Sequence, residues 1–282
     1  MSKLVAVFSV QHNPLLWRAL KAPTSPDLVA LRAEFAACAQ RLAALRPDVL
    51  LMVGTDHLRQ WFYDNMPAFL IGKAATMPGT FPDEARDFGL PTASLTGDPE
   101  LAASLLESGL RAGFDLASSD EYRVDHCVMV PLLFLRPALD LPVVPFFSNA
   151  IAPPIAPASR FLQVGTFLRR AIQDCPLPRR VAVIASGHTA TEVGGPRQFS
   201  GSPGPEFDEA TTRLLAAGDA PGLVDYCTDE TLVAAGNLTH QFLNFVTALG
   251  IAGCRPADSL KVLPTPFSSS PFFEWYAEGA DS

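Results

Sequence analysis

The strongest constraint on the fold is the alternation of short apolar runs with longer segments of helical periodicity. The run VAVIAS is typical of a buried strand, and the segment after Ser25, an expected helix N-cap, carries apolar residues at helical spacing. The expected strands are Leu4–Val10, Asp48–Val53, Ala68–Gly72, Leu141–Phe147 and Val181–Ser186, and the expected helices are Pro26–Leu45, Phe161–Gln173, Glu206–Ala217 and Leu238–Leu249. This alternation predicts an α/β fold with a mostly parallel or mixed central sheet, helices on both faces, and an active-site cleft at the strand carboxyl ends.

The chain shows neither an internal repeat nor a convincing linker, and its 282 residues suit one large domain. We therefore expect residues 1–282 to form a single catalytic domain. The stretch 265–282 is expected to be a C-terminal tail, whose aromatic residues (FFEWY) pack on the body of the protein or on a partner.

Composition excludes several classes of protein. Hydrophobic residues make up 48% of the chain and charged residues 18%, which does not fit disorder, and a net charge of −8 argues against a nucleic-acid binder. The most apolar stretch, Val128–Phe147, contains Arg136, Asp140 and four prolines, so we expect no membrane span. The five cysteines are widely spaced, which favours free thiols in a reducing compartment. These features together predict a cytoplasmic protein.

Three of the five histidines directly follow expected strands. They are His12, His57 in the segment GTDH, and His188 in the segment ASGHT. One histidine at a turn is usually a polar loop residue, but three at strand ends would meet at one edge of a parallel sheet. Imidazole is a good ligand for iron, zinc, copper and nickel. Asp56 either orients His57 or caps the following turn.

The order of motifs along the chain resembles that of the class III extradiol ring-cleavage dioxygenases, typified by the catalytic subunit of protocatechuate 4,5-dioxygenase. The segments that carry the resemblance are QHNP, GTDH, DHCVMVPL, ASGHT, GPEFDEATTRLLAAGD and AAGNLTHQFLNF. None of them is specific alone, but their order and spacing are, and they span nearly the whole chain.

The resemblance implies a role for each matching position. His12 and His57 are similar to the two imidazole ligands of Fe(II), and His188 is similar to the family's acid/base. His126 matches a second active-site histidine that lines the substrate pocket, where Thr189 and His240 are also expected.

The chain departs from the family at its third metal ligand, because Gln241 stands where the family has a glutamate. A neutral amide holds a dication less tightly than a carboxylate and donates less charge to iron. Either Glu230, Glu192 or His240 replaces the missing ligand, or the iron chemistry is impaired.

The expected function is therefore that of a non-haem iron oxidoreductase of aromatic catabolism. It would cleave the ring of a small catechol-like or aminophenol-like substrate with O2, as a homo-oligomer and possibly with a small second subunit. Two alternatives remain: a non-catalytic subunit that keeps the fold, and an enzyme whose altered metal site performs hydrolysis or proton transfer.

The glycine-rich stretch 194–205 lacks a nucleotide-binding motif, and is either a surface loop or a lid. Within it, Arg197 is either solvated or paired with a substrate carboxylate.

Overall fold

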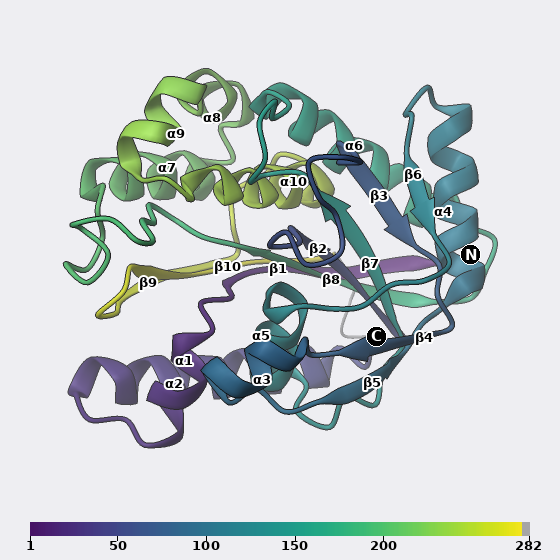
Figure 1. Ribbon diagram of the computed structural model, residues 1–282. Coiled ribbons are helices and arrows are strands. Elements are labelled where there is room, and N and C mark those ends of the chain that lie inside the picture. Colours follow the sequence, from purple (N-terminus) through teal and green to yellow (C-terminus); the bar gives the residue numbers. More distant parts are fainter. Residues whose placement is uncertain (278–282) are drawn as a thin grey trace.

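The computed structural model describes residues 1–277, which fold around a central sheet of eight strands (Figure 1). The strand order is β6-β3-β7-β2-β8-β1-β10-β9, and β4 and β5 form a separate two-stranded sheet. The strands are β1 (Lys3–Gln11), β2 (Val49–Gly54), β3 (Phe69–Gly72), β4 (Thr76–Gly79), β5 (Ala93–Thr96), β6 (Ala117–Ser119), β7 (Val143–Ser148), β8 (Arg180–Gly187), β9 (Ser259–Pro264) and β10 (Ser269–Tyr276).

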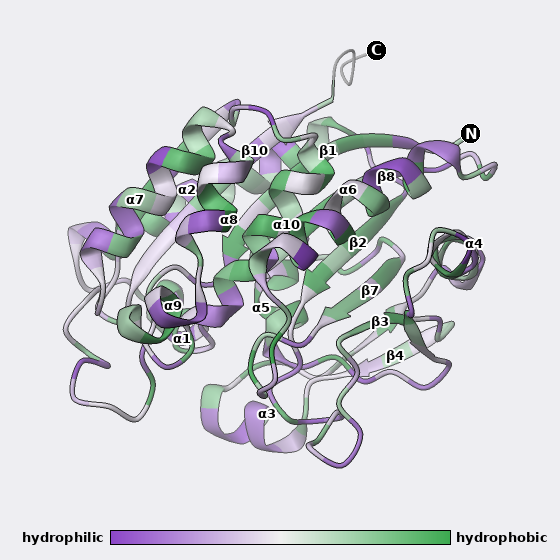
Figure 2. Cartoon of the chain, turned by 90° about the horizontal axis from the view of Figure 1, so that it is seen from above, coloured by the Kyte–Doolittle hydropathy of each residue, from purple (hydrophilic) through white to green (hydrophobic). Residues whose placement is uncertain are grey.

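Helices cover both faces of the sheet, as the sequence predicts. The helices are α1 (Leu15–Lys21), α2 (Pro26–Ala44), α3 (Pro82–Phe88), α4 (Pro99–Arg111), α5 (His126–Leu135), α6 (Ala158–Asp174), α7 (Pro205–Ala217), α8 (Ala220–Tyr226), α9 (Asp229–Ala235) and α10 (Leu243–Ala252). One core lies between the sheet and α4 and α6–α10, and a second lies between the sheet and α1, α2 and α5. Figure 2 shows the central strands, α5 and α10 as strongly hydrophobic.

Successive side chains of β8 point alternately into the two cores. Val181, Val183 and Ala185 face the first core, whereas Ala182 and Ile184 face the second. A strand that is buried on both faces has to be apolar throughout, which is why it reads as an uninterrupted apolar run in the sequence.

The sheet is mixed. The four strands β1, β8, β2 and β7 are parallel neighbours, whereas β10 is antiparallel to β1 and to β9, and β3 is antiparallel to β7. The fold class predicted from the sequence is therefore confirmed. Ser25 also caps α2 as expected, since its hydroxyl accepts a hydrogen bond from the backbone N–H of Leu28.

Two local expectations need correction. Residues 269–276 of the stretch expected to be a tail form strand β10, and its aromatic residues pack on the body of the protein: Phe272 and the pair Phe273 and Trp275 are buried on opposite faces of the sheet. The end of that expected tail, residues 278–282, lies outside the described residues. The helix expected to begin at Leu238 begins instead with a 3-10 turn, η1 (Thr239–Phe242), and continues as α10. No helix among residues 1–277 has the length and apolar content that a membrane span requires.

Candidate active site

The parallel strands β2, β8 and β1 lie side by side, and a histidine follows the carboxyl end of each. Residues Gln11 and Gly187 are paired in the β1–β8 ladder, so the segments leading to His12 and His188 leave the sheet together. His57 follows β2, which pairs with the other side of β8. A fourth histidine, His126, is the first residue of α5.

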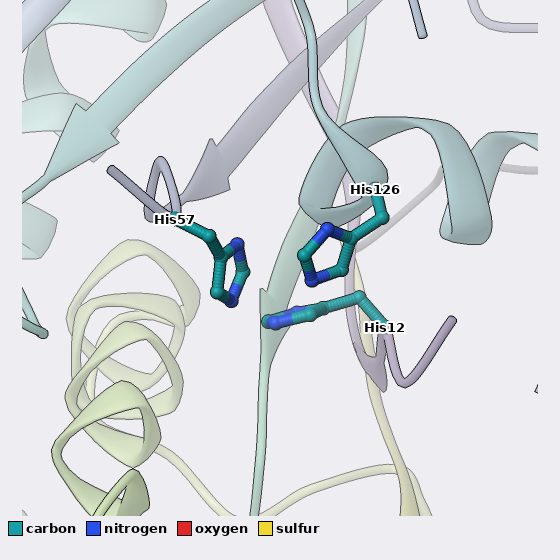
Figure 3. A group of neighbouring side chains, drawn as sticks. All are labelled: His12, His57 and His126. Atoms are coloured by element: carbon teal, nitrogen blue, oxygen red, sulfur yellow. The ribbon is translucent and has the colours of Figure 1, made fainter. Parts of the chain in front are cut away.

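The four imidazoles form one cluster, in which His57 is partly exposed and the other three rings are buried. Ring centroids are 4.1 Å apart for His12 and His188, 5.0 Å for His12 and His57, and 3.9 Å for His57 and His126. Figure 3 shows His12, His57 and His126 pointing toward one another. One potential ligand atom from each of these three residues lies within 4.8 Å of the other two. Because metal–nitrogen bonds are about 2 Å long, nitrogens that share one ion lie within about 4 Å of each other, so these rings need at most a small shift to hold one.

Two buried carboxylates fix the orientation of two of the rings. Asp125 Oδ2 lies 2.7 Å from His57 Nδ1 and also accepts the His57 backbone N–H. Glu84 Oε1 lies 2.6 Å from His126 Nδ1 and also accepts the His126 backbone N–H. A carboxylate acceptor at Nδ1 places the proton on that nitrogen and leaves the lone pair on Nε2, the arrangement found behind metal-bound histidines.

Ser186 fixes the orientation of the third ring, that of His12, and also places its proton on Nδ1. Its hydroxyl donates to the carbonyl oxygen of Cys127 at 2.6 Å, so its oxygen accepts the Nδ1–H of His12 at 2.8 Å. The Nε2 atom of His12 is buried and has no hydrogen-bond partner. All three rings therefore keep an Nε2 lone pair that no proton occupies.

Burial favours the neutral form of three of the four imidazoles, those of His12, His126 and His188. Burial, reinforced by the neighbouring imidazoles, lowers the pKa of His12 well below its ordinary value and that of His188 to about 3. Burial also lowers the pKa of His126 to about 3 and raises the pKa of Glu84. His188 Nδ1 has no hydrogen-bond partner, so this neutral ring has a nitrogen available to a ligand.

Gln241 faces the cluster from η1. Its Nε2 lies 3.1 Å from His57 Nε2, and its Oε1 is buried without a hydrogen-bond partner. Gly187 permits this approach, because a Cβ at that position would lie 2.6 Å from the backbone oxygen of Gln241. Asn244, one turn further on, donates to the carbonyl oxygen of Ser186 and anchors α10 to the strand ends.

Several expected site residues have other partners. The hydroxyl of Thr189 donates to the carbonyl oxygen of Ser269. His240 Nε2 bonds to Asp229 at 2.7 Å, and His240 lines a separate cavity of about 370 Å³ beside α8 and α9. Asp56 accepts the backbone N–H groups of residues 59, 60 and 61, so it caps the turn, and Asp125 is the carboxylate that orients His57.

The acids suggested as replacement ligands are engaged elsewhere. Glu230 is exposed on α9, and Glu192 forms an ion pair with Arg197, which is therefore not simply solvated. Among the described residues, neither acid stands in for a carboxylate at position 241. The sequence pattern does contain a signal for Asp125, since it precedes His126 directly, but it contains none for Glu84.

Comparison with known proteins gives consistent matches over this fold. Residues 6–277 match the family model described as the catalytic LigB subunit of aromatic ring-opening dioxygenase. A protein of Cupriavidus necator is 35% identical over 198 residues, covering 68% of this chain and 58% of that protein. A protein of Rhodococcus sp. is 29% identical over 233 residues, covering 82% of this chain and 69% of that protein. Both are named 2,3-dihydroxyphenylpropionate/2,3-dihydroxicinnamic acid 1,2-dioxygenase.

The match to a further relative of the same name, from Klebsiella pneumoniae (strain 342), is 32% identical and spans 54% of that protein's length. Among solved structures, the chain is similar to uncharacterized protein JW3007 from Escherichia coli K12, with a TM-score of 0.64 and 17% identity. That similarity covers 96% of this chain and 99% of the other, and it concerns the fold alone.

Proposed function

Because this chain belongs to the family of catalytic LigB subunits of aromatic ring-opening dioxygenases, we propose that it is an extradiol-type enzyme that opens a small aromatic ring with O2. The substrate carries either two adjacent hydroxyls or a hydroxyl beside an amine. The observation that carries the proposal is the convergence of three unprotonated imidazole nitrogens at one sheet edge, with a fourth neutral imidazole beside them. The names of the relatives support a ring with adjacent hydroxyls.

The residues of the cluster fit a divalent iron ion. The buried His12 Nε2 and Gln241 Oε1 have no partners, and imidazole nitrogen and amide oxygen are both suitable ligands for iron. His12 and His57 hold the ion in this proposal, and Gln241 contributes at most a neutral oxygen. A bound Fe(II) would supply a Lewis acid for the substrate oxygens and a redox-active centre for O2.

His188 acts as the acid/base in this proposal. Its ring is neutral, 5% exposed and adjacent to His12, so it can take the proton of a substrate hydroxyl that approaches the same edge. The burial of the cluster excludes water, which strengthens the electrostatic interactions of any charge that develops on the substrate. Asp125 fixes the orientation of the His57 ring, and Ser186 fixes that of the His12 ring.

The test combines metal analysis of protein purified without oxygen with O2 uptake on a panel of catechols and aminophenols. We expect stoichiometric iron and substrate-dependent O2 uptake. His188→Phe should keep its metal and bind substrate, while turnover falls about 10²–10⁴-fold, the usual contribution of a positioned acid/base. Unchanged turnover in His188→Phe would show that another residue is the base. Iron-loaded protein that takes up no O2 with any substrate would contradict the proposal.

One observation favours a second candidate. The ligand atoms that converge are all neutral, and three imidazoles are also the ligand set of zinc enzymes that activate water. Zinc in the purified protein, with hydrolytic activity and no O2 uptake, would identify that chemistry. Protein that binds neither metal would instead be a non-catalytic subunit.

A further inference from the structure

We propose that the third metal ligand of this chain is His126 rather than residue 241, and that Asp125 and Glu84 supply the negative charge that Gln241 lacks. The resemblance places His126 at the substrate, whereas its contacts favour the metal. This inference rests on the proposed function, because it requires a divalent ion in the cluster.

The first argument is the direction of the His126 ring. Its Nδ1–H is committed to Glu84, so its only free lone pair is on Nε2. The ring stacks on His57 at 3.9 Å with an interplanar angle of 29°, and both rings have a carboxylate behind Nδ1. Figure 3 shows the rings of His57, His126 and His12 pointing toward one another, and one potential ligand atom of each lies within 4.8 Å of the other two.

The second argument is charge. Glu84 is fully buried and Asp125 is 3% exposed, and the hydrogen bonds to both come from backbone N–H groups and neutral imidazoles. The guanidinium of Arg59 acts on Glu84 through space, but its ion pair is with Asp83. A buried carboxylate without a countercharge is costly. When both are ionised, two such carboxylates behind two ligand rings carry the charge that balances one divalent cation.

The third argument concerns Gln241 itself. Its amide nitrogen is the atom nearest to His57 Nε2, so the side chain donates a hydrogen bond to a lone pair that a metal would use. Gln241 also interacts with His12 through its side chain, but the amide oxygen carries no net charge. Residue 241 therefore adds little to the attraction for a cation, whereas Glu84 acts on it through His126 as a positioning residue.

The experiment measures Co²⁺ binding to protein that has been freed of metal with a chelator. Affinity is determined by competition with a chromophoric chelator for the wild type, His126→Ala, Glu84→Gln and Gln241→Ala. Glu107→Gln, at an exposed position on α4, is the control for loss of a carboxylate. We expect a loss of about 10–100-fold in His126→Ala and about 10-fold or more in Glu84→Gln. Gln241→Ala and Glu107→Gln should each change affinity less than about threefold.

The visible absorption bands of bound Co²⁺ give a second readout, since they report the ligand set and not activity. They should change in His126→Ala and remain in Gln241→Ala. If His126→Ala no longer unfolds cooperatively, the inference is judged by comparing the Co²⁺ affinities of Glu84→Gln and Gln241→Ala. A loss in Gln241→Ala that equals or exceeds the loss at His126 or Glu84 overturns the inference but leaves the proposed function standing. If the wild-type protein binds neither Co²⁺ nor Fe²⁺, the proposed metal-dependent function itself is contradicted.

Discussion

At the scale of single residues, Gln241 marks the difference between this chain and the pattern it resembles. Its side chain lies against His57, so the departure is located in the cluster and not at a distance from it. A neutral ligand at that point leaves the attraction for a cation to the carboxylates behind the imidazoles. Position 241 should therefore tune metal affinity without deciding whether metal binds.

Replacing Gln241 by Glu tests that statement. The substitution keeps the size of the side chain and adds a negative charge beside His57 Nε2. We expect Fe²⁺ affinity to rise by about 10-fold or more, because one unit of charge is added at ligand distance in a buried site. Chelator competition measures the change, with Gln241→Met as the uncharged control. Equal affinity in Gln241→Glu and the wild type would show that the side chain does not face the ion.

At the scale of elements, the crossing of α6 and α10 positions η1 and hence Gln241. The two helices approach closely because glycines meet at the crossing. A Cβ on Gly165 would lie 2.1 Å from the carbonyl oxygen of Thr247, and a Cβ on Gly250 would lie 2.6 Å from that of Leu162. Neither contact is possible without separating the helices.

Gly165→Ala should therefore destabilise the protein. Alanine gains up to about 1 kcal/mol of helix propensity, but the forced separation outweighs it, and we expect a net loss of roughly 1–3 kcal/mol. Urea unfolding measures the change. Gln163→Ala, at an exposed position of the same helix, is the control and should change stability by less than about 0.5 kcal/mol. A stability of Gly165→Ala equal to that of the wild type would contradict the close crossing.

At the scale of the whole molecule, the two ends of the described chain are joined in one sheet. β10 pairs with β1, and Arg41 on α2 bonds both Glu34 and the buried Glu274 of β10. Lys261 of β9 also bonds Glu34. The last strands are thus held over α2 by a charged network at the edge of the second core.

Arg41→Met should weaken that junction. It leaves Glu274, which is 1% exposed, without its cation, and removal of one partner from a buried pair is strongly destabilising. Because Arg41 itself is 33% exposed, we expect a loss of about 2–3 kcal/mol in urea unfolding, below that of a fully buried pair. Arg111→Met removes an exposed pair with Glu107 and should cost less than about 0.5 kcal/mol. Similar losses in the two variants would contradict a structural role for the network.

The sequence by itself determined the buried parallel strands, four of the ten helices described, and the histidines at three strand ends. These features depend on local patterns, since burial on both faces demands an apolar run and a strand end places the next residue at the sheet edge. Thr189 and His240 were expected at the substrate pocket from the resemblance, and in the structure their side chains bond to Ser269 and Asp229.

Only the tertiary structure decided which carboxylate stands behind which imidazole. Asp125 reaches His57 across 68 residues of chain, and Glu84 reaches His126 across 42, with no periodic signal at either position. The incorporation of residues 269–276 as strand β10 was decided in the same way, because only the pairing partner β1 distinguishes an inserted strand from a packed tail. Such pairings depend on the path of the chain through space, whereas apolar periodicity reports only which side of an element is buried.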